Sequence, residues 1–251
     1  MSRVVAIIPA RMGSSRFPGK PLALLRGRPM IEHVYARTAA CAQLDDVLIA
    51  TCDEEIVLAA SVFGAKSIMT SAAHQRATDR IAEACETHPA DIVVMVQGDE
   101  PMIRPDMVSA AITPLLENPT INCANLAAPI RTEIELRNPN TIKIVISRQG
   151  TALYFSREAI PTVVGRQFRL GTWYKQVCII AFRRDALRMF ASFSAGPLEI
   201  AESIDMLRFL ENCMPVHIIT TEAETHAVDT RADLELVEMM MADEPSYIAK
   251  S

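Results

Sequence analysis

The stretch from Ala10 to Leu22, ARMGSSRFPGKPL, decides how the rest of the chain is interpreted. It follows a short apolar run, Val4 to Pro9, that predicts a buried β-strand. Within the stretch, the side chains that suit an anionic ligand are Arg11, Ser14, Arg16 and Lys20. Arginine offers flat forks that match phosphate oxygens in pairs, and glycine lets the backbone come close to a ligand. Because open α/β sheets bind ligands beyond the carboxyl ends of their strands, the stretch predicts a polyanion-binding loop.

Two well-known phosphate-binding loops do not fit this stretch. A P-loop has four residues between its glycines and a Ser or Thr after its Lys, whereas five residues separate Gly13 from Gly19, and Pro21 follows Lys20. The Gly-x-Gly-x-x-Gly pattern of dinucleotide sites is absent. A solvated basic loop is the plainer alternative. The position directly after the first strand, together with both glycines and Pro18, favours the binding loop.

Length and composition limit the class of protein. The 251 residues suit one large domain, or one domain with a smaller lobe. The net charge is -5 and the isoelectric point is about 5.6, which argues against a nucleic acid or a membrane surface as general partner. The six cysteines are scattered without metal-binding spacing, as in reduced cytosolic proteins. No apolar run is long enough to span a bilayer, so we expect a soluble, cytoplasmic protein.

Strand-type and helix-type patterns alternate along most of the chain. Strands are expected at 4–9, 47–51, 67–69, 92–96, 123–128, 174–182 and 216–221. Helices are expected at 30–41, 53–64, 78–85, 105–117, 231–241 and from 197, with Ile200, Ile204, Leu207 and Leu210 along one face of the last of these. This alternation predicts an α/β fold with a doubly wound, mainly parallel sheet, in a single domain over 1–251.

One segment interrupts the alternation. Thr141 to Ser147 and Ala152 to Ser156 are two β-like runs that flank Arg148-Gln149-Gly150, a pattern that predicts a hairpin. No helix is expected between 138 and 182. We therefore expect a small β-rich lobe over these residues, and such an insertion commonly forms a contact between subunits.

Two aspartates could complete a site with the basic loop. Asp99 follows the most hydrophobic predicted strand, and Asp229 follows the last one. Each could instead cap a helix, although Pro101 and Pro105 place the next helix too late for Asp99, whereas Asp229 or Thr230 could cap the final helix. Magnesium takes a few carboxylate oxygens together with phosphate oxygens. The residues thus predict a metal-dependent enzyme that acts on a nucleoside triphosphate.

The same residues carry a family resemblance that spans nearly the whole chain. The segments concerned are, in order, IIPARMGSSRFPGKPL, MTSAAHQRATDRI, VQGDEPMI, ALYFSREAIP and VDTRADLELV. They resemble the 3-deoxy-manno-octulosonate (Kdo) cytidylyltransferases. The resemblance implies a nucleotide-diphosphosugar transferase-like fold, Mg²⁺ and a homodimer. It also implies that the anomeric hydroxyl of a sugar acid attacks the α-phosphate of CTP and releases pyrophosphate.

The resemblance also implies roles for individual residues. Those implied to hold the triphosphate are Arg11, Ser14, Arg16 and Lys20. Those implied to complete the nucleotide site are Arg76, Ala77, Thr78 and Gln97. The implied metal ligands are Asp99 and Asp229, and the residues implied to act in catalysis are Arg11, Lys20 and Asp99.

The chain departs from the family pattern on the sugar side. The family's H-x-S-G-T-[DE]-R is here HQRATDR, with Arg76-Ala77 in place of Ser-Gly, and its H-[LV]-G-[IV]-Y is QVCII. The positions implied to contact the sugar are Gln176, Ile180, Asp205 and Met206. A buried hydrogen bond that loses its partner costs about 1 to 3 kcal/mol, so four altered contacts would weaken Kdo binding unless new contacts replace them. We therefore expect the acceptor to be either Kdo or a modified relative.

Other interpretations stay open. The altered sugar positions would also suit a non-catalytic paralogue that binds the nucleotide without turnover, although paired metal ligands favour an enzyme. A glycosyltransferase of related fold would need an Asp-x-Asp motif, and Gln97-Gly98-Asp99 lacks the first carboxylate. Three cations, Arg166, Arg169 and Lys175, could meet a sugar carboxylate or could simply be solvated.

Overall fold

The first strand, β1 (Val4–Ala10), is the centre of the fold, and both of its faces are buried. Our computed structural model describes residues 2–14, 16–162, 168–242 and 247. Along β1, Val4, Ala6 and Ile8 pack into one hydrophobic cluster, whereas Val5 and Ile7 pack into another on the opposite face. A strand side chain alternates between faces, so an unbroken apolar run is what a strand covered on both sides requires.

The central sheet has the strand order β11-β7-β10-β6-β1-β4-β5. Its strands are β1, β4 (Asp46–Thr51), β5 (Lys66–Met69), β6 (Ile92–Val96), β7 (Cys123–Pro129), β10 (Tyr174–Arg183) and β11 (His217–Thr220). Strand β10 is antiparallel to both β6 and β7, and the other neighbours in this order are parallel. The doubly wound, mainly parallel sheet expected from the sequence is therefore confirmed.

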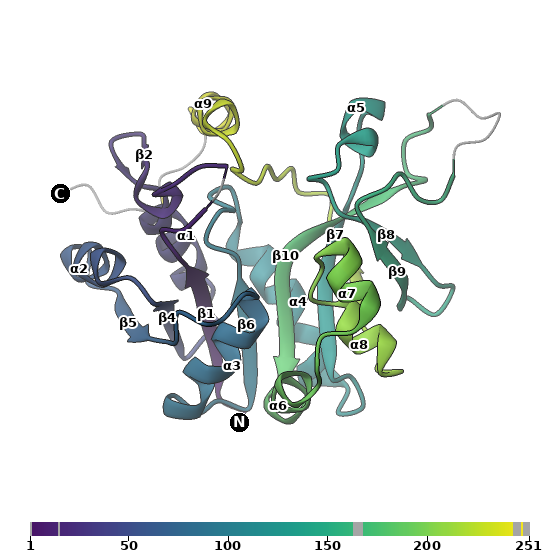
Figure 1. Ribbon diagram of the computed structural model, residues 1–251, viewed down its shortest axis with the longest axis horizontal. Helices are drawn as coiled ribbons and strands as arrows, with labels where there is room; N and C mark the ends of the chain where they lie inside the picture. The colour runs from purple at the N-terminus through teal and green to yellow at the C-terminus, as the bar shows by residue number, and fades with distance from the viewer. Residues whose placement is uncertain (1, 15, 163–167, 243–246, 248–251) are drawn as a thin grey trace.

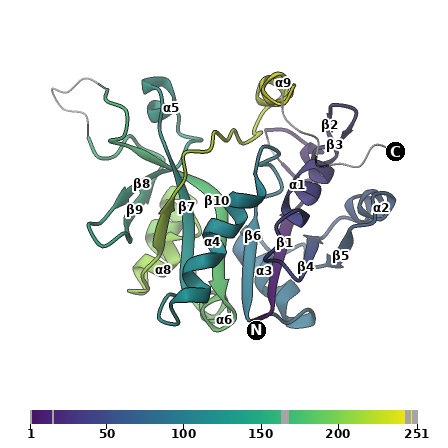
Figure 2. The ribbon, with the colours of Figure 1, turned by 180° about the vertical axis from the view of Figure 1, so that it is seen from behind.

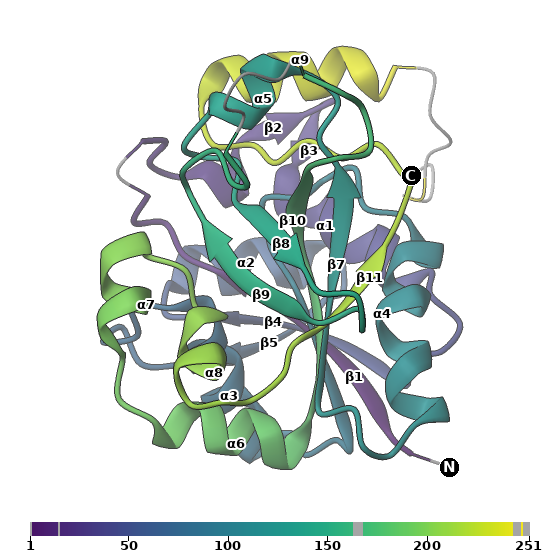
Figure 3. The ribbon, with the colours of Figure 1, turned by 90° about the vertical axis from the view of Figure 1, so that its right-hand side faces the viewer.

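Helices cover both faces of this sheet (Figures 1 and 2). One cluster takes in residues of α1 (Met30–Ala39), α2 (Glu54–Val62) and α4 (Pro105–Glu117). The other takes in residues of α3 (Ala77–Thr87), α6 (Arg184–Ser192) and α8 (Leu207–Glu211). Figure 3 shows α6, α7 (Pro197–Glu202) and α8 on one side of the sheet and α4 on the other. The remaining short elements and the final helix are η1 (Lys20–Leu22), β2 (Leu24–Leu25), β3 (Arg28–Pro29), α5 (Glu133–Arg137) and α9 (Arg231–Met240).

The direction of winding changes beside β1. The chain passes from β1 to β4 and β5 on one side, and then returns to place β6 on the other side of β1. In open α/β sheets, the crevice outside the carboxyl ends of the strands at such a point is where ligands bind. The loops that follow β1 and β6 meet at this position.

The predicted hairpin is present as β8 (Lys143–Ile146) and β9 (Ala152–Ser156), which pair in antiparallel register. Gly150 between them has φ of 76°, in the left-handed region that glycine adopts at least cost. The beginning of β10 pairs with β8, and its end pairs with β6. One continuous strand thus belongs to both the lobe and the central sheet.

One helix differs from its prediction. The sequence suggested a single helix from 197 with an apolar face reaching Leu210, whereas the structure has α7 and α8 separated at Ser203. Ser203 has φ of 57°, a left-handed conformation that ends α7. Ile200, expected on the apolar face, is 64% exposed. The apolar spacing therefore does not belong to one helix: Ile200 lies in α7, Leu207 and Leu210 lie in α8, and Ile204 lies between the two.

The sequence analysis also did not predict helix α6 or the residue at which α3 begins. The helix α6 lies within a stretch for which the sequence analysis expected no element, although Ala186, Leu187 and Phe190 have the spacing of a buried helical face. Helix α3 was expected from residue 78, but it starts at Ala77 after Arg76, which makes no side-chain capping bond. A side chain from another element satisfies this helix end instead.

A buried ion network joins α3, α7 and α8. The guanidinium of Arg208 makes two bonds to Glu199, at 2.7 and 2.8 Å, and two more to Asp79, at 2.7 and 3.2 Å. Glu199 is fully buried, and Arg208 also stacks on the Phe190 ring at 4.1 Å. Removing one partner of such a pair leaves an uncompensated buried charge, which is far more costly than losing a surface pair.

We expect Arg208→Met to lower the free energy of unfolding by about 3 to 5 kcal/mol, because Glu199 stays buried without its partner. Urea denaturation measures this change. Arg188→Met is the matched control, since Arg188 pairs with Glu86 where both side chains are about half exposed, and it should leave the free energy of unfolding nearly unchanged. Equal losses in the two variants would contradict the assignment of the Arg208 network as a stabilising element.

Candidate active site

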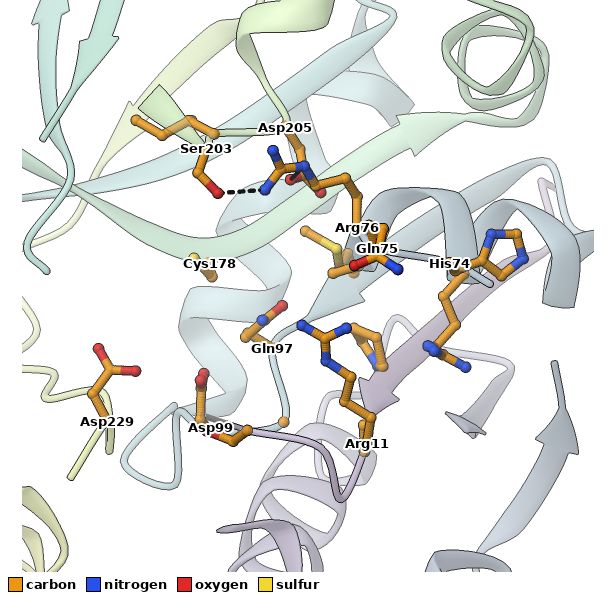
Figure 4. Close-up of a pocket in the computed structure, with 18 of the residues that line it drawn as sticks. Arg11, His74, Gln75, Arg76, Gln97, Asp99, Cys178, Ser203, Asp205 and Asp229 are labelled. Atoms are coloured by element: carbon orange, nitrogen blue, oxygen red, sulfur yellow. Dashed lines mark hydrogen bonds and ion pairs between the residues drawn. The ribbon is translucent and has the colours of Figure 1, made fainter. Parts of the chain in front are cut away.

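A cavity of about 580 Å³ lies at the carboxyl ends of β1 and β6 (Figure 4). The loop after β1, the segment before α3, the loop after β6, strand β10, the turn between α7 and α8 and the segment before α9 all contribute to its wall. The sequence-predicted site residues that line it are Arg11, Ser14, Arg16, Lys20, Arg76, Ala77, Gln97, Asp99, Gln176, Ile180, Asp205, Met206 and Asp229. Thr78 is buried beneath the wall.

The loop after β1 is fixed by its own backbone and by Asp53, the residue before α2. The carbonyl of Met12 accepts bonds from the N–H groups of Ser14 and Gly19, at 2.9 and 3.0 Å. The N–H of Met12 donates to Asp53 at 2.8 Å. Gly19 has φ of 72°, which lets the loop turn into η1 and places Lys20 in the cavity wall. At Gly13, in contrast, an added Cβ would have no neighbouring atom within 4 Å, so the structure does not require glycine there.

The loop after β6 packs too closely for any side chain at Gly98. A Cβ there would lie 2.9 Å from the carbonyl oxygen of Pro9 and 3.1 Å from Ile31. The backbone of Gln97 donates to the carbonyl of Cys178 on β10, and the carbonyl of Asp99 accepts from Val228. The first bond ties this loop to β10, and the second ties it to the segment that carries Asp229.

The ammonium group of Lys20 lies between the two predicted metal ligands. Its Nζ is 2.6 Å from Asp99 Oδ2 and 3.5 Å from Asp229 Oδ1. Burial opposes the charged form of Lys20, but the charges of Asp99 and Asp229 outweigh it, and the pKa of Lys20 is raised. Arg16 adds a second cation, because its guanidinium donates to Asp229 at 2.8 Å. Residues far apart in the sequence are thus brought into one charged cluster.

Neither aspartate caps a helix. Helix α4 starts at Pro105, six residues after Asp99, as the prolines suggested. Helix α9 has Thr230 as its N-cap, in a capping box with Asp233. The side chain of Asp229 is therefore left to face Lys20 and Arg16.

The donor groups fit a magnesium ion that is shared with phosphates. Asp99 and Asp229 supply hard carboxylate oxygens from two different loops, and Mg²⁺ is usually held by one or two carboxylates, waters and substrate phosphates. The residues described by the structure contain no group of three or more His, Cys, Asp or Glu side chains placed to cage a metal. A metal here would need oxygen atoms of the nucleotide to complete its coordination.

Glu100, which the sequence analysis did not single out, lies directly behind this cluster. Its side chain is buried, Oε1 accepts a long bond of 3.4 Å from the Cys178 N–H, and Oε2 has no partner among the described residues. Burial, and then the charge of neighbouring Asp99, raises the pKa of Glu100 to about 7. The two adjacent carboxyls therefore differ: one is salt-bridged at the cavity wall, and the other is buried in a setting that favours its protonated form.

We call the part of the cavity lined by Gln176, Cys178, Ile180, Asp205 and Met206 the β10 end. The amide of Gln176 donates to Asn125 Oδ1 at 2.6 Å, which holds it against β7. Ile180 and Met206 are almost completely buried. Asp205 Oδ2 accepts bonds from the backbone N–H and the hydroxyl of Thr78, at 3.2 and 2.8 Å. Burial raises the pKa of Asp205.

Asp205 is also the group that satisfies the start of α3. Thr78 is the second residue of that helix, and the first turn of a helix has N–H groups without partners inside the helix. The guanidinium of Arg76 also lies beside the turn between α7 and α8. It donates to Ser203 Oγ at 2.5 Å and to the carbonyl of Glu199 at 3.4 Å. The structure thus puts Arg76 and Thr78 beside the β10 end.

Two of the three other cations considered from the sequence, Arg169 and Lys175, do not line the cavity. Arg166 lies outside the described residues. Arg169 is exposed and is not part of the wall, and Lys175 pairs with Glu135 at 2.5 Å. Arg157 lines the wall instead and donates to the carbonyls of Glu202, Pro139 and Ser203. Its position at the end of the ALYFSR segment was the sequence signal that could have identified it.

Comparison with known proteins agrees with this geometry. A sequence model of the family described as cytidylyltransferase matches residues 5–218. The chain is 45% identical over 240 residues to a 3-deoxy-manno-octulosonate cytidylyltransferase of Pelobacter propionicus, with 92% of this chain and 94% of that protein covered. It is 42% identical to one of Geobacter metallireducens, with 94% and 96% covered.

Solved structures give the same result. The structure of a CMP:2-keto-3-deoxy-manno-octonic acid synthetase complexed with CTP matches with a TM-score of 0.89 and 39% identity, over 97% of this chain and all of that one. A glucose-1-phosphate thymidylyltransferase of Bacillus anthracis matches with a TM-score of 0.70 at 13% identity, which shows a shared fold alone. The chain is therefore a nucleotidyltransferase that belongs to the 3-deoxy-manno-octulosonate cytidylyltransferase family.

Proposed function

We propose that this enzyme transfers CMP from CTP to the anomeric hydroxyl of a 3-deoxy-ulosonic acid, either Kdo or a modified relative, in a Mg²⁺-dependent reaction. The observation that supports this most directly is the cluster in which Lys20 lies between Asp99 and Asp229, with Arg16 beside it. Phosphoryl and nucleotidyl transfer depend mainly on positioning and on neutralising charge. A cluster of alternating charges suits that chemistry, and this one lies where the direction of winding changes beside β1.

The nucleotide is assigned to the β1 side of the cavity. The cations of the loop after β1 bind the triphosphate, and Gln97 reads the base, since a side-chain amide can both donate to and accept from the edge of cytosine. A bound magnesium ion would neutralise phosphate charge and so reduce repulsion toward the incoming hydroxyl. Asp99 and Asp229 would hold it through carboxylate oxygens, and Lys20 would then be released to a phosphate oxygen.

The acceptor is assigned to the β10 end. The anomeric hydroxyl gives up its proton to water, and its oxygen forms a bond to the α-phosphorus. The bond from that phosphorus to the bridging oxygen of the β-phosphate breaks, and pyrophosphate leaves. Ile180 and Met206 offer no hydrogen bonds, and the amide of Gln176 is engaged with Asn125. These three side chains support an acceptor whose hydroxyl groups differ in part from those of Kdo.

A homodimer formed through the β-rich lobe remains part of the proposal. Leu153 on β9 and Leu170 between β9 and β10 are 61% and 65% exposed, and a subunit packed against the lobe would cover this apolar surface. For the residues that the structure describes, no helix is long and apolar enough to cross a bilayer. We propose a cytoplasmic location, where CTP is available.

The direct test is pyrophosphate release with each of the four nucleoside triphosphates and a panel of 3-deoxy sugar acids that includes Kdo. We expect turnover with CTP and at least one acid, and little with ATP, GTP or UTP. Calorimetric binding of CTP without turnover of any acid would favour the non-catalytic paralogue. The absence of both binding and turnover would contradict the proposal altogether.

We expect Asp99→Asn to lower kcat by at least about a hundredfold in saturating Mg²⁺, because an amide is a poor magnesium ligand and carries no charge. Steady-state pyrophosphate assays over a Mg²⁺ titration measure this effect. The matched control is Asp106→Asn, which alters an exposed carboxylate outside the cavity and should leave kcat within about twofold. Unchanged activity of the Asp99 variant would remove Asp99 from the metal site.

We expect Lys20→Met to raise the dissociation constant of CTP by about tenfold to a hundredfold, because a charge-assisted contact to the triphosphate is lost. Titration calorimetry with CTP measures it directly. Lys66→Met is the control: Lys66 pairs with Asp46 on an exposed edge and is not part of the cavity wall. A Lys20 variant that alters only the KM of the acid would show that the loop after β1 has been assigned to the wrong substrate.

A further inference from the structure

Arg76 and Asp205 form a loose ion pair at the β10 end. Arg76 Nε lies 3.9 Å from Asp205 Oδ1, which is beyond direct hydrogen-bond distance. Both side chains line the cavity, with 22% and 19% of their surface exposed. Figure 4 shows Arg76 extending from the segment before α3 toward Asp205 and Ser203. A ligand atom could therefore reach both members of the pair.

Asp205 retains one oxygen for such a ligand. Its Oδ2 is occupied by the two bonds from Thr78. Its Oδ1 has only the 3.9 Å contact with Arg76 among the residues described. An ionised carboxylate oxygen accepts hydrogen bonds and donates none. The pair thus presents an acceptor to the cavity.

Arg76 retains donors. Its Nη1 is bonded to Ser203, its Nη2 to the carbonyl of Glu199, and its Nε lies 3.3 Å from the Glu199 carboxylate. A guanidinium has five N–H donors, so two remain without a partner among the described residues, one on each terminal nitrogen. The pair therefore also presents donors to the cavity.

The surrounding charges favour a neutral ligand group over an anion. The carboxylates of Asp79, Glu199, Glu202 and Asp205 outnumber the guanidiniums of Arg76, Arg157 and Arg208 around this pair. An added carboxylate would lie close to Asp205 and would be repelled by it. A hydroxyl group carries no charge and can donate and accept at once, which matches a donor and an acceptor held side by side.

We propose that the Arg76–Asp205 pair determines acceptor specificity by binding two neighbouring hydroxyl groups of the sugar acid. One hydroxyl donates to Asp205 Oδ1, and the other accepts from a free N–H of Arg76. This inference rests on the proposed function, and it moves Arg76 from the nucleotide site to the acceptor site. The apolar neighbours Ile180 and Met206 leave this pair as a principal polar feature of the β10 end.

A site built to bind a hydroxyl rejects an analogue that lacks it, because its own polar groups are then left without partners. The test measures kcat/KM for Kdo, or for the panel acid that turns over fastest, and for analogues that each lack one hydroxyl. In the wild type, we expect loss of either bound hydroxyl to lower kcat/KM by about tenfold to a hundredfold.

Two variants then show which residues cause this loss of kcat/KM. In Arg76→Ser, the parent acid and the analogue that lacks the hydroxyl bound by Arg76 should differ in kcat/KM by about threefold or less, because that contact is absent. In Asp205→Asn, the same should hold for the analogue that lacks the hydroxyl bound by Asp205, while each variant keeps the discrimination at the other hydroxyl. Asp205→Asn keeps an oxygen for Thr78, so the start of α3 remains satisfied. Thermal unfolding and CTP calorimetry on each variant establish that the fold and the nucleotide site are intact, and Arg188→Met serves as the matched surface control.

Several results would overturn the assignment. If Arg76→Ser raises the KM of CTP and keeps the hydroxyl discrimination, Arg76 belongs to the nucleotide site. If both variants lose activity equally on the parent acid and on every analogue, the pair has only a structural role. If the wild type turns over no acid at all, the proposed function fails, and the assignment fails with it. Should Asp205→Asn not fold, Arg76→Ser and Arg76→Lys decide the question alone.

Discussion

The structure depends on the contact between one ammonium group and two carboxylates. Lys20 reaches the cavity from the loop after β1, Asp99 from the loop after β6 and Asp229 from the segment before α9. Like charges at such short range would repel, so the two aspartates can face each other only with a cation between them. In this structure the cation is a lysine, and a metal ion with its phosphates could take over the same role.

Much of the fold could be predicted because β1 and β6 are unbroken apolar runs, which only strands covered on both faces require. The break at Ser203 could not, since the spacing of Ile204 and Leu207 fits one helix as well as two. The antiparallel direction of β10 relative to β6 and β7 could not be predicted either. Strand direction depends on how the connecting segments lead the chain between strands, and no local pattern in Tyr174 to Phe182 records it.

The candidate site was predictable where chemistry is concentrated in short motifs. The loop after β1 and Asp99 fall into this class, and both line the cavity. Arg76 was different, because its position before α3 indicated the nucleotide, whereas its guanidinium reaches residues of α7 and the turn that follows. A long side chain can serve a subsite several ångströms from its own backbone, and the sequence gives no sign of that direction.

Asp205 links the architecture of the enzyme to the way its specificity can evolve. The same carboxylate accepts hydrogen bonds from the first turn of α3 and forms part of the cavity wall. A mutation there that suits a new substrate would also loosen a helix that covers the central sheet. We therefore expect new acceptor preferences to arise first at positions whose side chains have no second structural role, such as Cys178. Asp205 should change only to residues that keep an oxygen atom in place for Thr78.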